Sequence, residues 1–573
     1  MNNLLLTMGF KPVASNTIQR LLQATAISLI SGIIVILPAR SADEIYVDYG
    51  PFGRSIPASS LEAFAEDGTV EDELAPLLDA IPEESHQDFQ RVLSTPLQVL
   101  SSGIPEQIYD PFILSQWLYS PIGEAVLARV GQLIQTQGRR NGQQAIRAAI
   151  ILAAADSAGL SPINLLRHYP TGAVRLSLPK ILALSKAAKT NFETTDQLIA
   201  VATQRSEEAA ATEPSLDYSA LPILGEFAQF NVVKQSLMLE DRQRDRDYPV
   251  DLYMPTDLNA IQGPIPVMLL SHGYGDTRTN LEAVAAARSL AANGFLVAMP
   301  EHVGSNKTYQ DELLEGLVQE SFEAMEFVNR PLDIRFLLDT LEQKNATEFQ
   351  GRLQLDRVGL VGHSFGGYTV LAAAGATVDI DRLQRQCDLD ADITPENVNV
   401  ALLLECRLLE LEESTIQQLT DGSLTDERVG HVFALAPVSN LFGESGMGKI
   451  QIPVVIMGGA TDVASPIALE QLVAFQGLTT PEKYFYLGEN LSHTPAMTRV
   501  LLNVTNPNSE VVDSFDEAEE LFSSLIVSLA IAHAQVYLLG NDSYSPYLTS
   551  AYVEAVSIEP TKLHLLRSIP DEL

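Results

Sequence analysis

The chain has 573 residues, of which 46% are hydrophobic and 19% are charged. This balance is typical of globular proteins and excludes an intrinsically disordered chain. The length exceeds what one compact core accommodates, so we expect at least two domains. The formal net charge of -37 gives an acidic surface that repels phosphate backbones, and we therefore expect no nucleic-acid partner.

Residues 1–42 have the pattern of a targeting segment. Lys11 and Arg20 precede an apolar run over residues 21–37, and the small residues Ala39 and Ser41 follow it. This order is typical of a cleaved signal peptide. The alternative is a retained N-terminal anchor, for which the run is at the short end. In both cases we expect an exported protein, periplasmic or secreted, and a retained segment would hold it at a membrane surface.

Residues 43–205 predict a domain made of helices alone. The segment "SSLEAFAEDG" starts with two capping serines and ends at Gly68, and the alanine-rich "GQQAIRAAIILAAADSAG" ends at Gly159. Nothing in this part of the chain indicates a chemistry. Residues 206–222 are polar, rich in alanine and interrupted by proline, which predicts a linker.

Residues 223–573 predict an α/β domain. A strand pair is expected around the charged turn "RQRDRD", followed by apolar strands such as "IPVMLLS" and "FLVAMP" that alternate with helical segments. Strands and helices in alternation indicate a mostly parallel central sheet flanked by helices. In such a sheet, ligands bind beyond the carboxyl ends of the strands.

The stretch "VGLVGHSFGGYT" fits a nucleophile turn between a strand and a helix. Gly362, Ser364 and Gly366 match the pattern G-x-S-x-G, and the strand–turn–helix context is the one that this motif requires. A bulky side chain at either glycine would collide with neighbouring elements. Ser364 is therefore the candidate nucleophile.

A serine hydroxyl needs a base, and in the order Ser, acid, His that base follows the last strand of the unit. The loop "GENLSHTP" places His493 there. Two other histidines compete with it: His431 begins a predicted strand, and His533 lies within a predicted helix. Neither position follows a strand, so His493 is the candidate base.

The candidate acid is Asp462, which follows the preceding predicted strand in "IPVVIMGGATDVASP". Its carboxylate would accept the imidazole N–H and stabilise the cation formed on proton transfer. The alternative role for Asp462 is to cap the turn before the next helix. Glu444, which follows the strand "HVFALAP", is the second candidate acid.

Two backbone N–H groups are needed to hold the oxyanion. One is expected from Phe365, directly after the nucleophile, and the other from Tyr274 in the loop "SHGYGDT". His272 is expected to orient this loop and is also a candidate for lining the site. His302, at the end of another predicted strand, is a further candidate for lining the site.

An insertion is predicted at about residues 378–428, and it contains both cysteines, Cys387 and Cys406. In an exported protein this pair predicts a disulfide, with two buried thiols as the alternative. The apolar stretch "NVNVALLLECRLLELEE" is either a lid over the serine or an amphipathic helix packed on the core. No metal or organic cofactor is expected, and the sequence predicts no oligomeric state.

The quoted motifs resemble the α/β-hydrolase superfamily. Within it, "LLSHGYGDTRTNLEAVAAARSLAANGFLVAMPEH" and "GLVGHSFGGYT" look like platelet-activating-factor acetylhydrolases and dienelactone-hydrolase-like proteins, over about residues 225–500. The residues before them resemble a helical domain of unknown function that precedes such hydrolases. Acetylhydrolases carry their acid after the strand matching "VFALAP", where this chain has no aspartate, and dienelactone-hydrolase-like proteins use a cysteine nucleophile where it has Ser364.

The resemblance implies a serine esterase acting on ester-linked acyl groups. We expect carboxylic esters, including phospholipid or other short-acyl esters, with a small-molecule or lipid substrate. A peptidase with the same triad is one alternative, because that triad also cleaves amides. A catalytically silent exported binding protein is the other.

Overall fold

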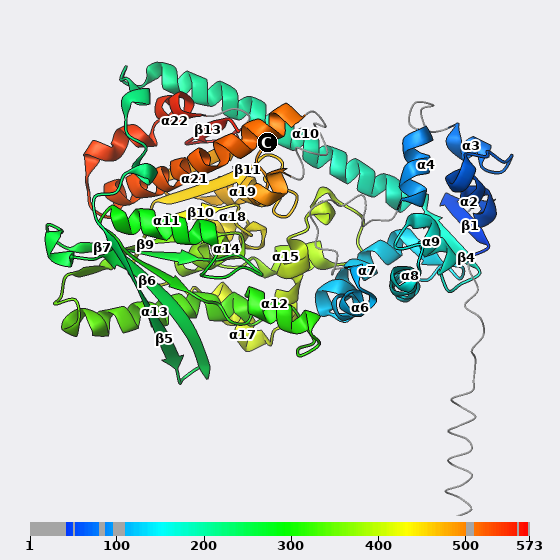
Figure 1. The fold of residues 1–573 in the computed structure, drawn as a ribbon, viewed down its shortest axis with the longest axis horizontal. Coiled ribbons are helices and arrows are strands. Elements are labelled where there is room, and N and C mark those ends of the chain that lie inside the picture. The colour runs from blue at the N-terminus through cyan, green and yellow to red at the C-terminus, as the bar shows by residue number, and fades with distance from the viewer. Residues whose placement is uncertain are drawn as a thin grey trace, which may run out of the picture.

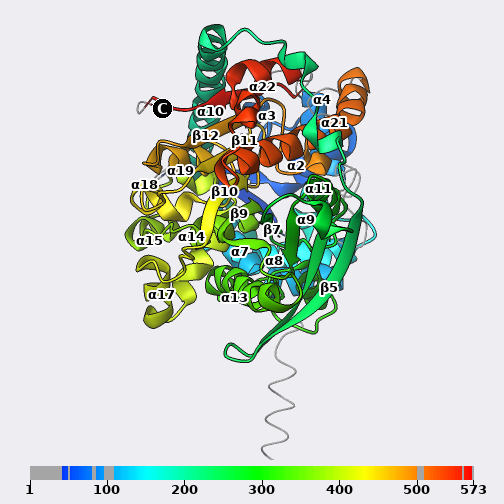
Figure 2. The same ribbon diagram turned by 90° about the vertical axis from the view of Figure 1, so that its left-hand side faces the viewer.

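The structure is a computed structural model that describes residues 42–49, 52–79, 86–95, 109–499, 509–557, 561–570 and 573. The predicted targeting segment, except for Ala42, lies outside these residues. Figures 1 and 2 show two bodies joined by a long helix: a small N-terminal domain and a larger α/β domain.

The N-terminal domain contains a sheet, so the prediction of a domain made of helices alone is wrong. Its strands, in the order β2-β1-β4-β3, are β1 (Glu44–Tyr49), β2 (Phe52–Pro57), β3 (Ile134–Thr136) and β4 (Ala173–Ser177). Strand β1 pairs in parallel with β4, which follows more than 120 residues later, with Glu44 opposite Ala173. Strand β1 also pairs antiparallel with the neighbouring β2, and strands of three to six residues leave a weak periodic signal in the sequence.

Helices surround this small sheet on the N-terminal side of the molecule. They are α2 (Ala58–Asp67), α3 (Ala75–Leu78), α4 (His86–Ser94), α6 (Pro111–Tyr119), α7 (Pro121–Leu133), α8 (Gln143–Ala155) and α9 (Pro162–Arg167). Helix α2 ends where predicted, because Gly68 adopts a left-handed conformation with φ of 81° and its N–H bonds to the Phe64 carbonyl.

Helix α10 (Leu178–Thr212) connects the two domains along 35 residues. Residues 206–212, predicted as linker, are therefore its last turns. Glutamate and alanine favour a helix there, and Pro214 comes just beyond its end. The side chains of Leu198 and Ala202 are buried in the main core cluster of the α/β domain, so the helix is part of both domains.

Within the described residues, nine strands form one mixed sheet in the order β13-β12-β11-β10-β9-β7-β8-β6-β5. The six from β12 to β8 are parallel neighbours, and β5, β6 and β13 pair antiparallel. Their bounds are β5 (Val232–Asp241), β6 (Arg246–Pro255), β7 (Ile265–Ser271), β8 (Leu296–Pro300), β9 (Leu353–His363), β10 (Val429–Leu435), β11 (Val454–Gly459), β12 (Lys483–Gly488) and β13 (Leu563–Leu566).

Helices cover both faces of this sheet (Figure 1). They are α11 (Leu281–Ala292), α12 (Lys307–Leu314), α13 (Glu326–Thr347), α14 (Phe365–Ala373), α15 (Ile380–Cys387), α16 (Leu402–Glu405), α17 (Glu413–Thr420), α18 (Gly443–Met447), α19 (Gln471–Gly477), α21 (Ser509–Tyr537) and α22 (Ser550–Val556). Successive side chains of β7 point to opposite faces of the sheet. Met268 packs on the face covered by α11 and α21, and Leu269 packs on the face covered by α13 and α14.

One helix in the described residues is long and apolar enough to cross a membrane. It is Glu519–Tyr537 within α21, and half of that window is buried inside the protein. Leu529 and Ala532 on this helix are fully buried in the core cluster on its side of the sheet. This burial is typical of a helix that packs in a protein core.

The predicted insertion is helical and packs on the core. It holds α15, α16 and α17, and the structure pairs Cys387 with Cys406 in a disulfide across its first half. Leu402 and Leu408 in its apolar stretch are fully buried in the main core cluster. Of the two alternatives for this stretch, the packing favours an amphipathic segment on the core over a lid.

Candidate functional site

Ser364 occupies a strained turn between β9 and α14. Its backbone angles are φ 57° and ψ −121°, a region that residues other than glycine seldom adopt. The two flanking glycines make the turn feasible: a Cβ on Gly362 would lie 2.1 Å from the Gly366 carbonyl oxygen, and one on Gly366 would lie 2.0 Å from the Ser271 carbonyl oxygen. Both positions thus exclude a side chain, as expected from the motif.

His493 and Asp462 meet beyond the ends of β12 and β11. Nδ1 of His493 lies 2.8 Å from Oδ2 of Asp462, whose carboxylate is shielded from solvent. The other oxygen, Oδ1, accepts the backbone N–H groups of Ala464 and Ser465, at 2.9 Å each. Asp462 therefore caps the turn with one oxygen and contacts the imidazole with the other.

The competing residues lie elsewhere. Glu444, the second candidate acid, is exposed at the start of α18. His431 and His533 are fully buried and stack on each other, with 5.5 Å between ring centroids. A base must reach a substrate bound at Ser364, and these two imidazoles sit inside the core on the α21 side of the sheet.

Sequence reasoning did not single out His363, which lies next to Ser364 in the chain and contacts the candidate base, His493. It precedes Ser364 in the chain, and its Nε2–H donates to the backbone carbonyl of His493 at 2.9 Å. The two imidazole rings lie 4.8 Å apart. Desolvation lowers the pKa of His363 to about 4, so the ring is neutral near pH 7. No hydrogen bond joins Ser364 to His493 among the described residues, a looseness common in unliganded enzymes.

The loop after β7 passes close over Ser364. A Cβ on Gly273 would lie 3.3 Å from Cβ of Ser364, so glycine allows the backbone to approach the nucleophile. In the described part of the chain, neither Tyr274 nor Phe365 has an acceptor for its backbone N–H. Both N–H groups are therefore free to hold an oxyanion. The Tyr274 phenol itself donates to Ser321 Oγ at 2.7 Å.

His272 and His302 form one buried pair behind this loop. Nε2 of His272 accepts the His302 backbone N–H at 3.0 Å, so Nδ1 carries the proton and donates to the Gly273 carbonyl at 2.8 Å. His302 is 0% exposed, and its two nitrogens bond to Ser271 and Asp333. Desolvation lowers the pKa of both imidazoles well below the ordinary value. His302 is thus a buried support residue and does not line the cavity.

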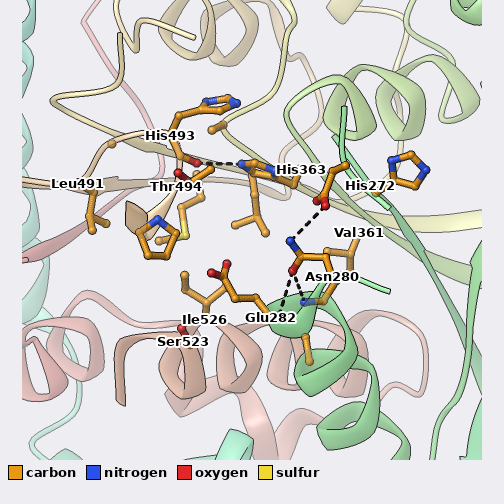
Figure 3. Close-up of a pocket in the computed structure, with 18 of the residues that line it drawn as sticks. His272, Asn280, Glu282, Val361, His363, Leu491, His493, Thr494, Ser523 and Ile526 are labelled. Carbon is orange, nitrogen blue, oxygen red and sulfur yellow. Dashed lines mark hydrogen bonds between the residues drawn. The ribbon is translucent and has the colours of Figure 1, made fainter. Parts of the chain in front are cut away.

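A cavity of about 270 Å³ adjoins the candidate base. Figure 3 shows His363 and His493 on one side of it and Glu282, Ser523 and Ile526 on the other. Its wall is mostly apolar and includes Val361, Leu435, Met457, Leu491, Phe515, Phe522, Ile526 and Val527. Three carboxylates also line it, those of Asp276, Glu282 and Glu519. Burial, and next the Glu519 charge, raise the pKa of Glu282.

The parallel strands with helices on both faces are compatible with an α/β-hydrolase fold. Residues 41–177 match a family model described as alpha/beta hydrolase of unknown function (DUF1400). The match covers the N-terminal domain and leaves Ser364, Asp462 and His493 outside it. No curated protein matches the chain. The family match supports assignment to the α/β-hydrolase superfamily. Among the described residues, no group of three or more His, Cys, Asp or Glu is arranged to hold a metal ion.

Proposed function

We propose that the protein is a serine hydrolase that cleaves carboxylic esters through Ser364, His493 and Asp462. One observation carries this proposal: the His493–Asp462 pair, 2.8 Å apart, contacts His363, which directly precedes a serine held in a strained turn at the carboxyl edge of the sheet. Strain of this kind persists where the surrounding structure holds it, and it clusters at active sites.

In the first half-reaction, the Ser364 hydroxyl attacks the ester carbonyl while His493 Nε2 takes its proton. The negative charge that develops on the carbonyl oxygen is stabilised by the Tyr274 and Phe365 N–H groups. Asp462 stabilises the imidazolium. Collapse of the tetrahedral intermediate expels the alcohol, to which His493 returns the proton, and leaves an acyl group on Ser364.

In the second half-reaction, His493 removes a proton from water, which attacks the acyl carbonyl. A second tetrahedral intermediate forms in the same N–H pair and collapses to the carboxylic acid. His493 then returns the proton to the Ser364 oxygen. Atoms and charges balance without a cofactor, and each step uses only groups within the described site.

The cavity beside His493 supports an apolar ester as substrate. Its largely apolar wall suits a small acyl or alkyl group, and a volume near 270 Å³ is close to the lower end for ligand pockets. The carboxylates of Glu282 and Glu519 at the same cavity disfavour an anion. We therefore propose a neutral or zwitterionic ester, of which a lipid ester is one kind.

The test is covalent labelling combined with turnover. A fluorophosphonate probe is expected to label the wild type and to fail on Ser364→Ala, while p-nitrophenyl esters are hydrolysed and matched amides are not. Faster cleavage of the amides would favour the peptidase. An unlabelled, inactive wild type would favour the silent binding protein. A chain-length series of esters then gives the acyl preference.

We also propose that the protein works outside the cytoplasm. The Cys387–Cys406 disulfide supports an oxidising compartment, because such bonds persist mainly in exported proteins. An uncleaved segment before residue 42 would keep the enzyme at a membrane surface and near lipid esters. Fractionation of cells that express the full chain, with sizing of the mature protein by mass spectrometry, tests both statements.

A further inference from the structure

A buried arginine on α13 contacts the Gly273 carbonyl, which shares a peptide group with the Tyr274 N–H, and the ring of Phe365. The Arg330 side chain is 0% exposed. Its guanidinium donates to the His272 carbonyl at 2.7 Å, to the Gly273 carbonyl at 3.3 Å and to Ser305 Oγ at 2.9 Å. These contacts fix the loop that passes over Ser364.

The contact with the Gly273 carbonyl reaches the oxyanion site directly. That carbonyl belongs to the same planar peptide group as the Tyr274 N–H, so fixing the C=O also fixes the direction of the N–H. His272 Nδ1–H donates to the same oxygen at 2.8 Å. Two donors on the carbonyl polarise the peptide and make its N–H a stronger donor, because linked hydrogen bonds strengthen one another.

The same guanidinium also contacts the second proposed donor residue. Its carbon lies 4.6 Å from the centroid of the Phe365 ring, within cation–π range. Phe365 is the first residue of α14, so this contact holds the helix end that presents its N–H. One side chain therefore ties together the two segments that must converge on a substrate oxygen.

Arg330 differs from the neighbouring Arg246 in its hydrogen-bond partners, which are neutral oxygens and not carboxylates. Arg246 pairs with Glu326 and Asp333 at 2.8 and 2.9 Å, so carboxylates offset its charge. The nearest carboxylate to Arg330, that of Glu326, is 3.8 Å away, and its short contacts are to neutral oxygens. Desolvation lowers the pKa of Arg330 only to about 10, so it stays charged at neutral pH.

We propose that Arg330 is the positioning residue of the oxyanion site. It holds and polarises the Gly273–Tyr274 peptide so that the Tyr274 N–H meets the negative charge that develops on the substrate carbonyl oxygen. This role rests on the proposed ester hydrolysis at Ser364, and it places the influence of Arg330 on the chemical step and not on substrate binding.

The test compares Arg330 with a matched buried arginine. Arg330→Lys and Arg330→Met are set against Arg246→Lys and Arg246→Met, which alter the same ionic cluster without touching the loop carbonyls. Because loss of one oxyanion donor costs about 100- to 1000-fold in kcat, we expect kcat to fall about 100-fold in Arg330→Met and about tenfold in Arg330→Lys. KM is expected to stay within about threefold of the wild-type value.

A second readout does not depend on activity. Hydrogen exchange of peptides that cover residues 272–276 is expected to quicken in both Arg330 variants and to stay unchanged in Arg246→Lys. Rates are compared at equal folded fraction, judged by near-UV circular dichroism, and Arg330→Lys carries the comparison if Arg330→Met does not fold.

The contrary results are distinct. An Arg330→Lys enzyme with wild-type kcat, or one whose loss lies in KM, overturns the positioning role and leaves the ester hydrolase standing. Equal losses of kcat in Arg330→Lys and Arg246→Lys show a general structural role and overturn it too. A wild type that neither turns over esters nor binds fluorophosphonate overturns the hydrolase, and this proposal with it.

Discussion

The imidazole rings of His363 and His493 lie 4.8 Å apart, and Nε2 of His363 donates to the His493 backbone carbonyl at 2.9 Å. The loop that carries the candidate base is thus fastened to the residue that directly precedes the candidate nucleophile. This contact sets the separation of Ser364 and His493 more directly than the strands do, because each of the two residues lies beyond the end of its strand.

Replacing His363 with phenylalanine is expected to lower kcat about fivefold with little change in KM. Phenylalanine keeps the ring but removes the donor to the His493 carbonyl, and loss of one hydrogen bond frees the loop by about 1 kcal/mol. Steady-state kinetics on a p-nitrophenyl ester measures this. His363→Asn, whose amide retains a donor, should lose less, and equal losses in the two variants would contradict the role of the bond.

Asp462→Asn is expected to lower kcat by about 10³- to 10⁴-fold, while the fold is retained. The asparagine oxygen still accepts the Ala464 and Ser465 N–H groups, but its amide nitrogen then faces His493 Nδ1 and favours the wrong imidazole tautomer. The measurement is kcat beside the melting temperature. Glu444→Gln, at the exposed second candidate acid, is the control, and a larger loss there would move the acid to Glu444.

Two glycine substitutions are expected to fail in different ways. A Cβ on Gly366 would lie 2.0 Å from a backbone oxygen, so Gly366→Ala should prevent soluble expression. A Cβ on Gly273 would lie 3.3 Å from the Ser364 Cβ, a contact that small shifts relieve. Gly273→Ala should therefore fold and lose at least about tenfold in kcat. Expression yield, melting temperature and kinetics check both, and a folded, fully active Gly366→Ala would contradict the turn geometry.

Two fully buried carboxyls predict a pH dependence of stability. Asn440 joins Glu405 and Glu470: its amide donates to Glu405 at 3.2 Å and its backbone N–H to Glu470 at 2.8 Å. Burial raises the pKa of Glu470 to about 7. Burial, and then the Glu470 charge, raise the pKa of Glu405 well above the ordinary value.

The free energy of unfolding is expected to fall as the pH rises from about 5 to 7. Glutamates in the unfolded chain lose their protons near pH 4.3, whereas these two keep theirs in the folded protein. Each retained proton therefore lowers the free energy of unfolding by about 1.4 kcal/mol per pH unit. Urea unfolding at pH 5, 6 and 7 measures the slope. Glu470→Gln should reduce this slope by the contribution of up to one proton, and Glu444→Gln should leave the slope unchanged. An unchanged slope in Glu470→Gln would contradict the raised pKa of Glu470.

Local pattern was enough to predict eight of the nine described strands of the α/β domain, all except β13, and to place Ser364, Asp462 and His493 beyond strand ends. Ser364 directly follows β9, Asp462 lies three residues beyond β11 and His493 lies five residues beyond β12. The carboxyl ends of parallel strands share one edge, so order along the chain translates into proximity. The disulfide partners were predictable for a similar reason, since Cys387 and Cys406 are 19 positions apart within one insertion.

What escaped prediction depends on contacts between distant segments. The parallel pairing of β1 with β4 joins segments more than 120 residues apart. Arg330 lies in "NRPLDIRFLL", a stretch that has no pattern beyond that of a helix, and its partners are backbone carbonyls 57 and 58 positions away. His302 follows a strand as a site residue would, but the packing of Asp333 and Ser271 around it places it inside the protein.

Helix α10 has a consequence for the order in which the protein folds. Ser206 on this helix accepts the backbone N–H of Leu565 on β13, across 359 positions of the chain. Glu213, just past its end, accepts the N–H groups of Ser550 and Ala551. The C-terminal part of this helix therefore lacks these hydrogen-bond partners until almost all of the chain is available. Docking of this part of α10 is therefore expected to complete late, because such long-range closure is slow.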